Sequence, residues 1–204
     1  MTASLTARSL CLFRGDRCLF NDLEFTLQEG EMLVVEGPNG SGKTSLLRAI
    51  AGLLDFESGV LAWKGDSVRD HYQVFRADLV WFAHRVGFKG DLDLLENLAF
   101  ESGLRTNADA SCEEVLERLG LDQVRHLPFR SLSAGQQRRG ALARMLLSGA
   151  QIWIMDEPLT NLDKEGQALV IAVIEAHIKE GGLCLAASHQ PLEIAGATRR
   201  VMLS

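Results

Sequence analysis

Short apolar runs and longer amphipathic segments alternate along most of the chain. An apolar run of about four to eight residues favours a buried strand, whereas apolar residues three and four positions apart favour a helix. Residues 44–53 have the helical spacing, with Leu46, Leu47, Ile50 and Leu54 in phase. Runs typical of strands cover residues 32–36, 59–63, 79–83, 151–155, 183–187 and 199–203.

Two more strands are predicted near the amino terminus, at residues 5–12 and 19–27, around the turn Arg14-Gly15-Asp16-Arg17. Helical patterns separate most of the later strands, and residues 164–179 form the last of these helices. Strands that alternate with helices indicate an α/β fold with a mainly parallel sheet and helices on both faces.

Residues 84–149 differ from the rest because the pattern there is mostly helical. Three helices are predicted, at 94–101, 111–119 and 136–148, and Asp109 or Ser111 is a suitable cap for the second. We therefore expect one domain over residues 1–204, with a core at about 1–83 and 150–204 and a helical subdomain at about 84–149.

Charge and cysteine usage narrow the classes of partner. The 204 residues carry a formal net charge of −6, which argues against nucleic acid as the main partner. The four cysteines form no CxxC pair, so a zinc site or disulfide framework is not expected. No apolar run approaches the roughly 20 residues of a membrane helix, so any transport path should belong to other chains.

A glycine-rich loop follows the predicted strand at 32–36 and precedes a predicted helix. Such a loop can point backbone N–H groups at phosphates, and the helix dipole favours negative charge there. The lysine is expected to reach the β- and γ-phosphates of ATP, and the threonine hydroxyl to reach Mg²⁺. The loop matches the P-loop pattern and reads Gly37, Pro38, Asn39, Gly40, Ser41, Gly42, Lys43 and Thr44.

Two adjacent acids, Asp156 and Glu157, end the predicted strand at 151–155. A strand-end aspartate holds Mg²⁺ in P-loop ATPases, so Asp156 is the expected metal ligand. Glu157 is placed to polarise an attacking water, as a general base. By itself such a pair is most often a solvated strand end. The P-loop earlier in the chain makes the interpretation as metal ligand and general base the favoured one.

Between these motifs, Leu132, Ser133, Ala134, Gly135 and Gln136 resemble the LSGGQ signature of the ABC ATPases, with alanine in place of the first glycine. Further on, Asn161-Leu162-Asp163 resembles the family's D-loop, and His189 its switch histidine. The resemblance covers nearly the whole chain. It implies a RecA-like P-loop core of the ABC type with an amino-terminal antiparallel hairpin.

The resemblance also implies a head-to-tail homodimer around two ATP molecules. Each ATP would lie between the P-loop of one copy and the signature segment of the other, where Ser133 and the N–H of Gly135 begin a helix. His189 would contact the γ-phosphate, and Asp163 would couple the two sites.

Two positions depart from the family pattern. The strand-end glutamine that contacts Mg²⁺ and water in ABC ATPases is replaced by His84, whose charge near neutral pH is variable. The alternative is that His84 is only a polar strand end. The aromatic residue that stacks on adenine should fall near Phe13 or Arg14, and either side chain can stack on a base.

His84, the variant signature and the segment His189-Gln190-Pro191-Leu192 together resemble the haem-exporter ATP-binding subunits of bacterial cytochrome c maturation. That resemblance implies a peripheral protein on the cytoplasmic face of the inner membrane, with integral-membrane partner subunits. Haem is expected to be handled only indirectly, since nothing in this chain resembles a haem site.

Other interpretations remain open. The chain could be a soluble ABC ATPase, for example in cluster assembly, or the motor of an exporter for another substrate. A small GTPase or kinase is disfavoured, because the guanine-reading N-K-x-D motif is absent. If membrane subunits bind, the expected contact is Phe88, Leu92, Leu94 and Leu95, unless these residues are simply part of the core.

Overall fold

Two sheets organise the computed structural model, which describes residues 4–83, 86–102, 112–189 and 191–204. An antiparallel sheet has the strand order β2-β1-β4-β5, and a parallel sheet has the order β6-β7-β8-β3-β9. The strands are β1 (Ser4–Arg14), β2 (Arg17–Gln28), β3 (Glu31–Glu36), β4 (Ser58–Trp63), β5 (Asp66–Ser67), β6 (Leu79–Phe82), β7 (Ile152–Asp156), β8 (Leu183–Ala187) and β9 (Ala197–Met202). The expected α/β fold with its amino-terminal hairpin is confirmed.

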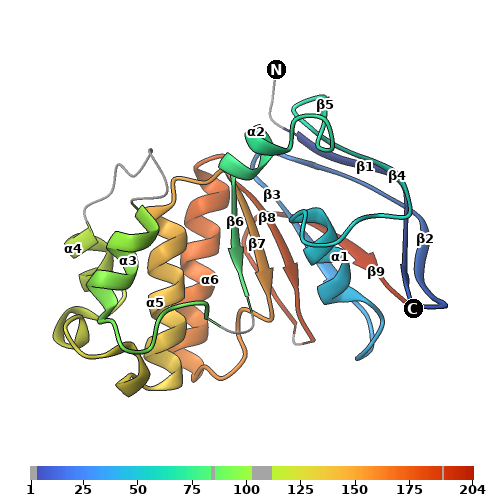
Figure 1. The fold of residues 1–204 in the computed structure, drawn as a ribbon. Helices are drawn as coiled ribbons and strands as arrows, with labels where there is room; N and C mark the ends of the chain where they lie inside the picture. Colours follow the sequence, from blue (N-terminus) through green and yellow to red (C-terminus); the bar gives the residue numbers. More distant parts are fainter. Residues whose placement is uncertain (1–3, 84–85, 103–111, 190) are drawn as a thin grey trace.

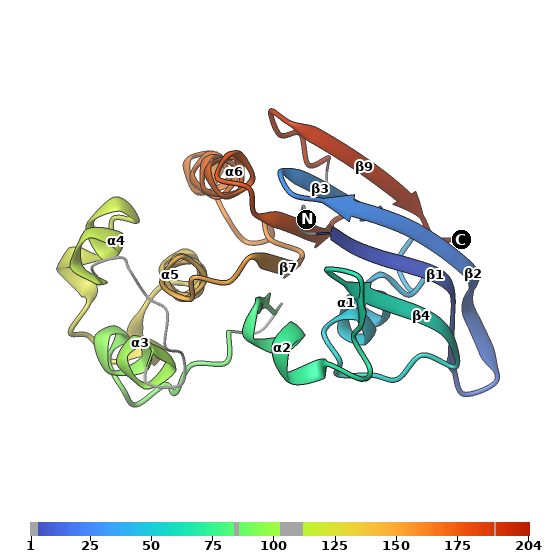
Figure 2. The same ribbon diagram turned by 90° about the horizontal axis from the view of Figure 1, so that it is seen from above.

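Helices cover both faces of the parallel sheet (Figures 1 and 2). On one face lie α5 and α6, and on the other α1 packs between the two sheets. The helices are α1 (Lys43–Ile50), α2 (Tyr72–Ala77), α3 (Leu94–Ser102), α4 (Cys112–Arg118), α5 (Ala134–Leu147) and α6 (Lys164–Lys179), with short 3₁₀ turns at Asp122–Val124 and Phe129–Ser131.

Alternation along the parallel strands divides the core in two. Successive side chains of a strand point to opposite faces. On β7, Trp153 and Met155 pack with α5 and α6, whereas Ile152 and Ile154 pack with α1 and the antiparallel sheet. The strands β3, β6, β7 and β8 are buried on both faces, which explains why each reads as a continuous apolar run, whereas the edge strand β9 is largely exposed.

The edge strand β9 is held to β3 by charge as well as by backbone pairing. Arg199 donates two hydrogen bonds of 2.8 Å to the carboxylate of Glu31, and Arg200 pairs with Glu36. The Arg199 hydrogen bonds lower the pKa of Glu31 below its ordinary value, and burial opposes this effect. Charged side chains of this kind also protect an exposed sheet edge from pairing with other chains.

The helical region packs around a buried asparagine. The side chain of Asn97 on α3 accepts from the N–H of Lys89 at 2.8 Å and donates to three backbone carbonyls, including that of Asp93 at 2.8 Å. The predicted contact residue Leu94 is fully buried, so the alternative that it belongs to the core is correct. Phe88 packs edge-on against Phe129 with 4.9 Å between ring centroids.

The sequence prediction does not include every helix of the structure. The short helix α2 was not predicted, because Phe75 is its only buried residue and leaves no periodic pattern. Asp109 and Ser111, the suggested caps, lie outside the described residues. In the part of the chain that the structure describes, no helix is long and apolar enough to cross a membrane.

Candidate functional site

The P-loop connects β3 to α1 at the carboxyl edge of the parallel sheet (Figure 1). Gly37, Gly40 and Gly42 have φ values of 147°, 82° and 102°, which L side chains rarely adopt. Lys43 is only 7% exposed. Its ammonium group donates to the carbonyls of Gly37 at 2.7 Å and Pro38 at 3.1 Å. The loop therefore folds around the lysine and keeps a positive charge at its centre.

Crowding inside the loop explains why glycine is required at its start. A Cβ on Gly37 would lie 2.4 Å from the carbonyl oxygen of Leu203 and 2.6 Å from the hydroxyl of Ser41. That hydroxyl is buried and has no hydrogen-bond partner among the described residues. A buried polar atom without a partner is costly, and the phosphate oxygens of ATP fit it as acceptors.

Thr44 and Asp156 meet at the expected metal site. The Thr44 hydroxyl donates to the Asp156 carboxylate, with distances of 3.0 and 3.1 Å to the two oxygens. Asp156 is only 4% exposed at the end of β7, beside β8 and β6. No cluster of three His, Cys, Asp or Glu side chains suits a metal among the described residues. One hydroxyl and one carboxylate suit Mg²⁺ that also binds nucleotide phosphates.

Glu157 and His189 form a direct pair. His189 Nδ1 lies 2.6 Å from Glu157 Oε2, and the backbone N–H of His189 donates to the same oxygen at 3.4 Å. The two residues follow neighbouring parallel strands, β7 and β8, so their side chains come from the same edge of the sheet. The φ of Glu157 is 54°, an unusual value for a non-glycine residue and a feature that is common at functional sites.

The signature segment begins α5 through a capping box. The Ser133 hydroxyl accepts from the N–H of Gln136 at 3.2 Å, and the Gln136 side chain accepts from the N–H of Ser133 at 2.9 Å. Leu132 is buried below, whereas Ser133 and Ala134 are exposed. The start of α5 is therefore held by two side-chain-to-backbone hydrogen bonds and is exposed at Ser133 and Ala134.

Asp163, the expected D-loop residue, caps α6 by accepting from the N–H of Gly166 at 2.8 Å. Asn161, Asp163, Ser133 and Gly135 share the lining of one cavity of about 750 Å³. The structure thus brings the signature and D-loop segments together around one cavity, which the P-loop residues 37–44 do not line.

The adenine-stacking candidates end β1. Phe13 is 46% exposed, and Arg14 is exposed beside it. The hairpin that carries them reaches the P-loop, because a Cβ on Gly42 would lie 3.1 Å from the Cβ of Leu19. Both side chains stay candidates for contact with the base.

His84 lies outside the described residues, and its role in the site stays a prediction. We expect His84→Gln to keep most of the ATPase rate, because glutamine is the residue that the ABC pattern has at this position. Steady-state turnover of the variant and the parent chain checks this. Loss of nearly all turnover in His84→Gln would show that the imidazole has a role that an amide cannot take.

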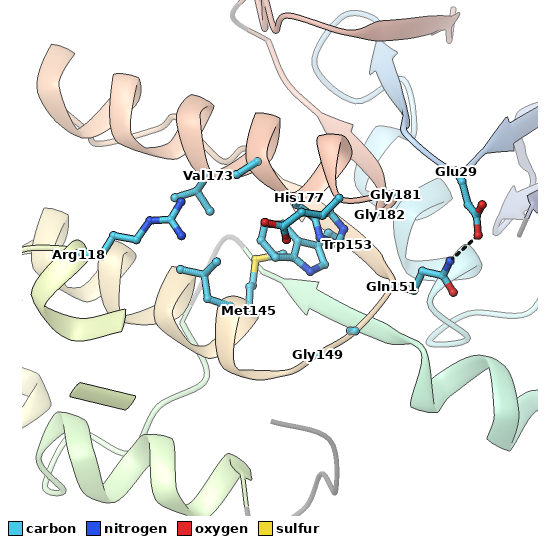
Figure 3. A pocket seen from close by; sticks show the side chains of 14 residues that line it. Glu29, Arg118, Met145, Gly149, Gln151, Trp153, Val173, His177, Gly181 and Gly182 are labelled. Atoms are coloured by element: carbon cyan, nitrogen blue, oxygen red, sulfur yellow. Dashed lines mark hydrogen bonds between the residues drawn. The ribbon is translucent and has the colours of Figure 1, made fainter. Parts of the chain in front are cut away.

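A second cavity, of about 460 Å³, lies at the opposite end of the strands, where β7 and β8 begin (Figure 3). The ring of His177 stacks on Trp153 there, with 3.8 Å between centroids, and its Nε2 lies 3.4 Å from the carbonyl of Leu183. A Cβ at Gly182 would come within 2.2 Å of the imidazole. Burial lowers the pKa of His177 from 6.5 to about 4.

This burial predicts an acid-sensitive stability. The unfolded histidine takes up a proton near pH 6.5 and the folded one only near pH 4, so stability is full above pH 6.5 and falls as the pH drops toward 4. Between pH 7 and pH 5, His177 should account for a loss of about 2 kcal/mol in the free energy of unfolding. Urea titration of the parent chain and His177→Phe at both pH values measures this.

The exposed His71 supplies the matched control, His71→Asn. Glu29, Glu180 and Arg118 line the same cavity and are present in both proteins. An equal loss of stability between pH 7 and pH 5 in the parent chain and His177→Phe would contradict the assignment to His177.

One arginine at the site carries no role in the sequence analysis. The guanidinium of Arg138 on α5 donates to the backbone carbonyl of Glu157 and lies 4.8 Å above the centroid of the Phe82 ring. It is 5% exposed. No sequence signal marks it, since arginine is rarely buried and the helix pattern does not show which residues meet a strand end.

Comparison with known proteins defines the class. Residues 20–160 match the model of the ABC transporter family, and the chain belongs to this family. The ATP-binding subunit of an ABC transporter has a similar fold, with a TM-score of 0.82 and 21% identity, covering 91% of this chain and 79% of that one. A nucleotide-free ATP-binding cassette has a TM-score of 0.79 and 18% identity, covering 93% and 82%.

Relatives with higher sequence identity match nearly the whole length of this chain. The cytochrome c biogenesis ATP-binding export protein CcmA of Methylococcus capsulatus is 43% identical over 204 residues, covering 99% of each chain. CcmA of Yersinia pseudotuberculosis is 41% identical over 202 residues, covering 98% of this chain and 93% of its own. The resemblance inferred from the sequence is confirmed.

Proposed function

We propose that this chain is the ATP-hydrolysing motor subunit of an ABC exporter that serves cytochrome c maturation. The observation that carries the ATPase part is the shared edge of the parallel sheet. There β3, β7 and β8 end in the P-loop, the Asp156-Glu157 pair and His189. In open α/β sheets, ligands bind outside the carboxyl ends of the strands.

Each residue has a distinct role in hydrolysis. The P-loop N–H groups and Lys43 hold the phosphate chain, and Thr44 with Asp156 holds Mg²⁺. When bound, Mg²⁺ neutralises charge on the phosphate oxygens. Glu157 orients and polarises the water, and His189 fixes the Glu157 carboxylate through their 2.6 Å contact.

The signature segment acts on the ATP of a second copy. Ser133 and Gly135 lie on the face that also carries Asp163, at the exposed start of α5. A helix start of this kind presents N–H groups to an anion. Two copies arranged head to tail would therefore close around two ATP molecules, and Asp163 would link the two sites.

The assignment of this chain to an exporter rests on the names of its relatives. Proteins 41–43% identical over nearly the whole chain are named cytochrome c biogenesis ATP-binding export proteins. We infer that this chain binds integral-membrane subunits at the cytoplasmic face of the bacterial inner membrane and acts on haem only through them.

Affinity purification from membranes tests this assignment. The tagged chain should recover two integral-membrane subunits of the cytochrome c maturation system, and bound haem should stay with those subunits after the motor chain is dissociated. Co-expression that leaves the chain entirely in the soluble fraction would favour a soluble ABC ATPase. Recovery of unrelated membrane subunits would favour an exporter of another substrate.

A further inference from the structure

Arg138 occupies an unusual position between the helical region and the hydrolysis site. It belongs to α5, the helix that begins at the signature segment, yet its guanidinium reaches the end of β7. Only 5% of the residue is exposed. Burial of an arginine is costly and is tolerated only where specific partners compensate it.

Two partners of Arg138 belong to the catalytic edge of the sheet. The guanidinium donates to the carbonyl oxygen of Glu157 and stacks over Phe82, the last residue of β6. Burial lowers the pKa of Arg138, and the nearby charges of Asp156 and Glu157 act in the opposite direction. The side chain thus places a positive charge beside the two acids that are assigned to metal and water.

The contact falls on a strained peptide. Glu157 has a φ of 54°, a left-handed conformation that needs support from its surroundings when the residue is not glycine. Its N–H donates to the carbonyl of Ala187 at 2.9 Å, and its own carbonyl accepts from Arg138 and from the N–H of Thr160 at 3.3 Å. The backbone at Glu157 is therefore fixed from both sides.

We propose that Arg138 is a positioning residue that holds the Glu157 carboxylate at the attacking water and makes hydrolysis depend on the placement of α5. This inference rests on the proposed role of Glu157. Because α5 starts at the signature segment, a shift of that helix when the segment meets a second copy's ATP would move Arg138 and, through its carbonyl contact, Glu157.

The test compares Arg138→Met with the parent assembly recovered from membranes. We expect kcat to fall about 10²-fold, because small misplacements of a catalytic group have effects of that size. The KM for ATP should stay within about threefold, since the Glu157 carbonyl and the Phe82 ring that Arg138 contacts lie outside the nucleotide-binding loop. Arg138→Lys should recover part of kcat, because it keeps a cation and a donor but not the planar fork.

Arg144→Met is the matched control for loss of a half-buried arginine. Arg144 lies on the same helix, donates to the Trp81 carbonyl at 3.0 Å and stacks over Phe88 at 5.4 Å, away from Glu157. Thermal unfolding should show similar losses of stability in the two methionine variants, with the large fall in kcat confined to Arg138→Met. Equal kcat values in both variants would overturn the proposal.

A double variant tests whether Arg138 acts on hydrolysis through Glu157. If Arg138 acts through Glu157, adding Arg138→Met to Glu157→Gln should lower residual turnover no further. Multiplicative losses would show that Arg138 acts elsewhere. Normal turnover in Glu157→Gln alone would instead overturn the proposed role of Glu157, so the two failures are distinguishable.

Discussion

Lys43→Ala should abolish ATP turnover, lowering it by at least about 10²- to 10³-fold, the range found when one preorganised donor is removed from a reacting oxyanion. The lysine carries the positive charge at the centre of the P-loop, held by the carbonyls of Gly37 and Pro38. ATP affinity should fall about 10- to 100-fold, because a hydrogen bond to a charged group contributes about 1.5–3 kcal/mol.

Calorimetric titration with ATP and steady-state hydrolysis measure the two effects separately. Lys64→Ala is the control, since that lysine forms an exposed ion pair with Asp78 at 2.9 Å on the antiparallel side of the fold. Such exposed ion pairs contribute little to the stability of a protein. A Lys43→Ala chain that binds and hydrolyses ATP at the parent rate would remove the P-loop interpretation.

Glu157→Gln should bind ATP without hydrolysing it. The amide preserves the size of the side chain and a hydrogen bond to His189, but it is too weak a base to polarise water. General-base assistance contributes roughly 10²- to 10⁴-fold in rate, or about 3–5 kcal/mol of barrier. Since hydrolysis would release the dimer, the variant should accumulate as an ATP-bound dimer.

Size-exclusion chromatography with and without ATP detects that dimer. Glu114→Gln, an exposed change on α4, should remain as active as the parent chain. A Glu157→Gln protein that stays monomeric at saturating ATP would argue against the sandwich arrangement, and one that turns over normally would argue against a catalytic glutamate.

The elements with strong patterns were predictable from sequence. The α6 and β8 ranges agree residue for residue with the prediction, since α6 presents an apolar stripe and β8 is buried on both faces. The P-loop and the Asp156-Glu157 pair were found because their chemistry restricts residue type and spacing. Parallel strands then bring Glu157 and His189 together, although they lie far apart in the sequence.

Other features depend on tertiary contacts that leave no periodic trace. The left-handed backbone of Glu157 is imposed by its neighbours, and nothing in its residue type announces it. Arg138 looks in the sequence like an ordinary exposed helix position, yet the helix rotation brings it against a strand end. The stacking of the half-buried His177 on Trp153 has the same origin.

Gly37, which follows β3, lies close to the carbonyl of Leu203, which follows β9. The ends of these two neighbouring strands therefore meet at the P-loop. The N–H of Leu203 also donates to the carbonyl of Glu36 at 2.9 Å, so the backbone after β9 borders the loop directly. Sliding of β9 along β3 would therefore change the shape of the phosphate cradle. The mechanical stiffness of an edge strand, secured by Arg199 and Glu31, becomes part of how this protein holds its nucleotide.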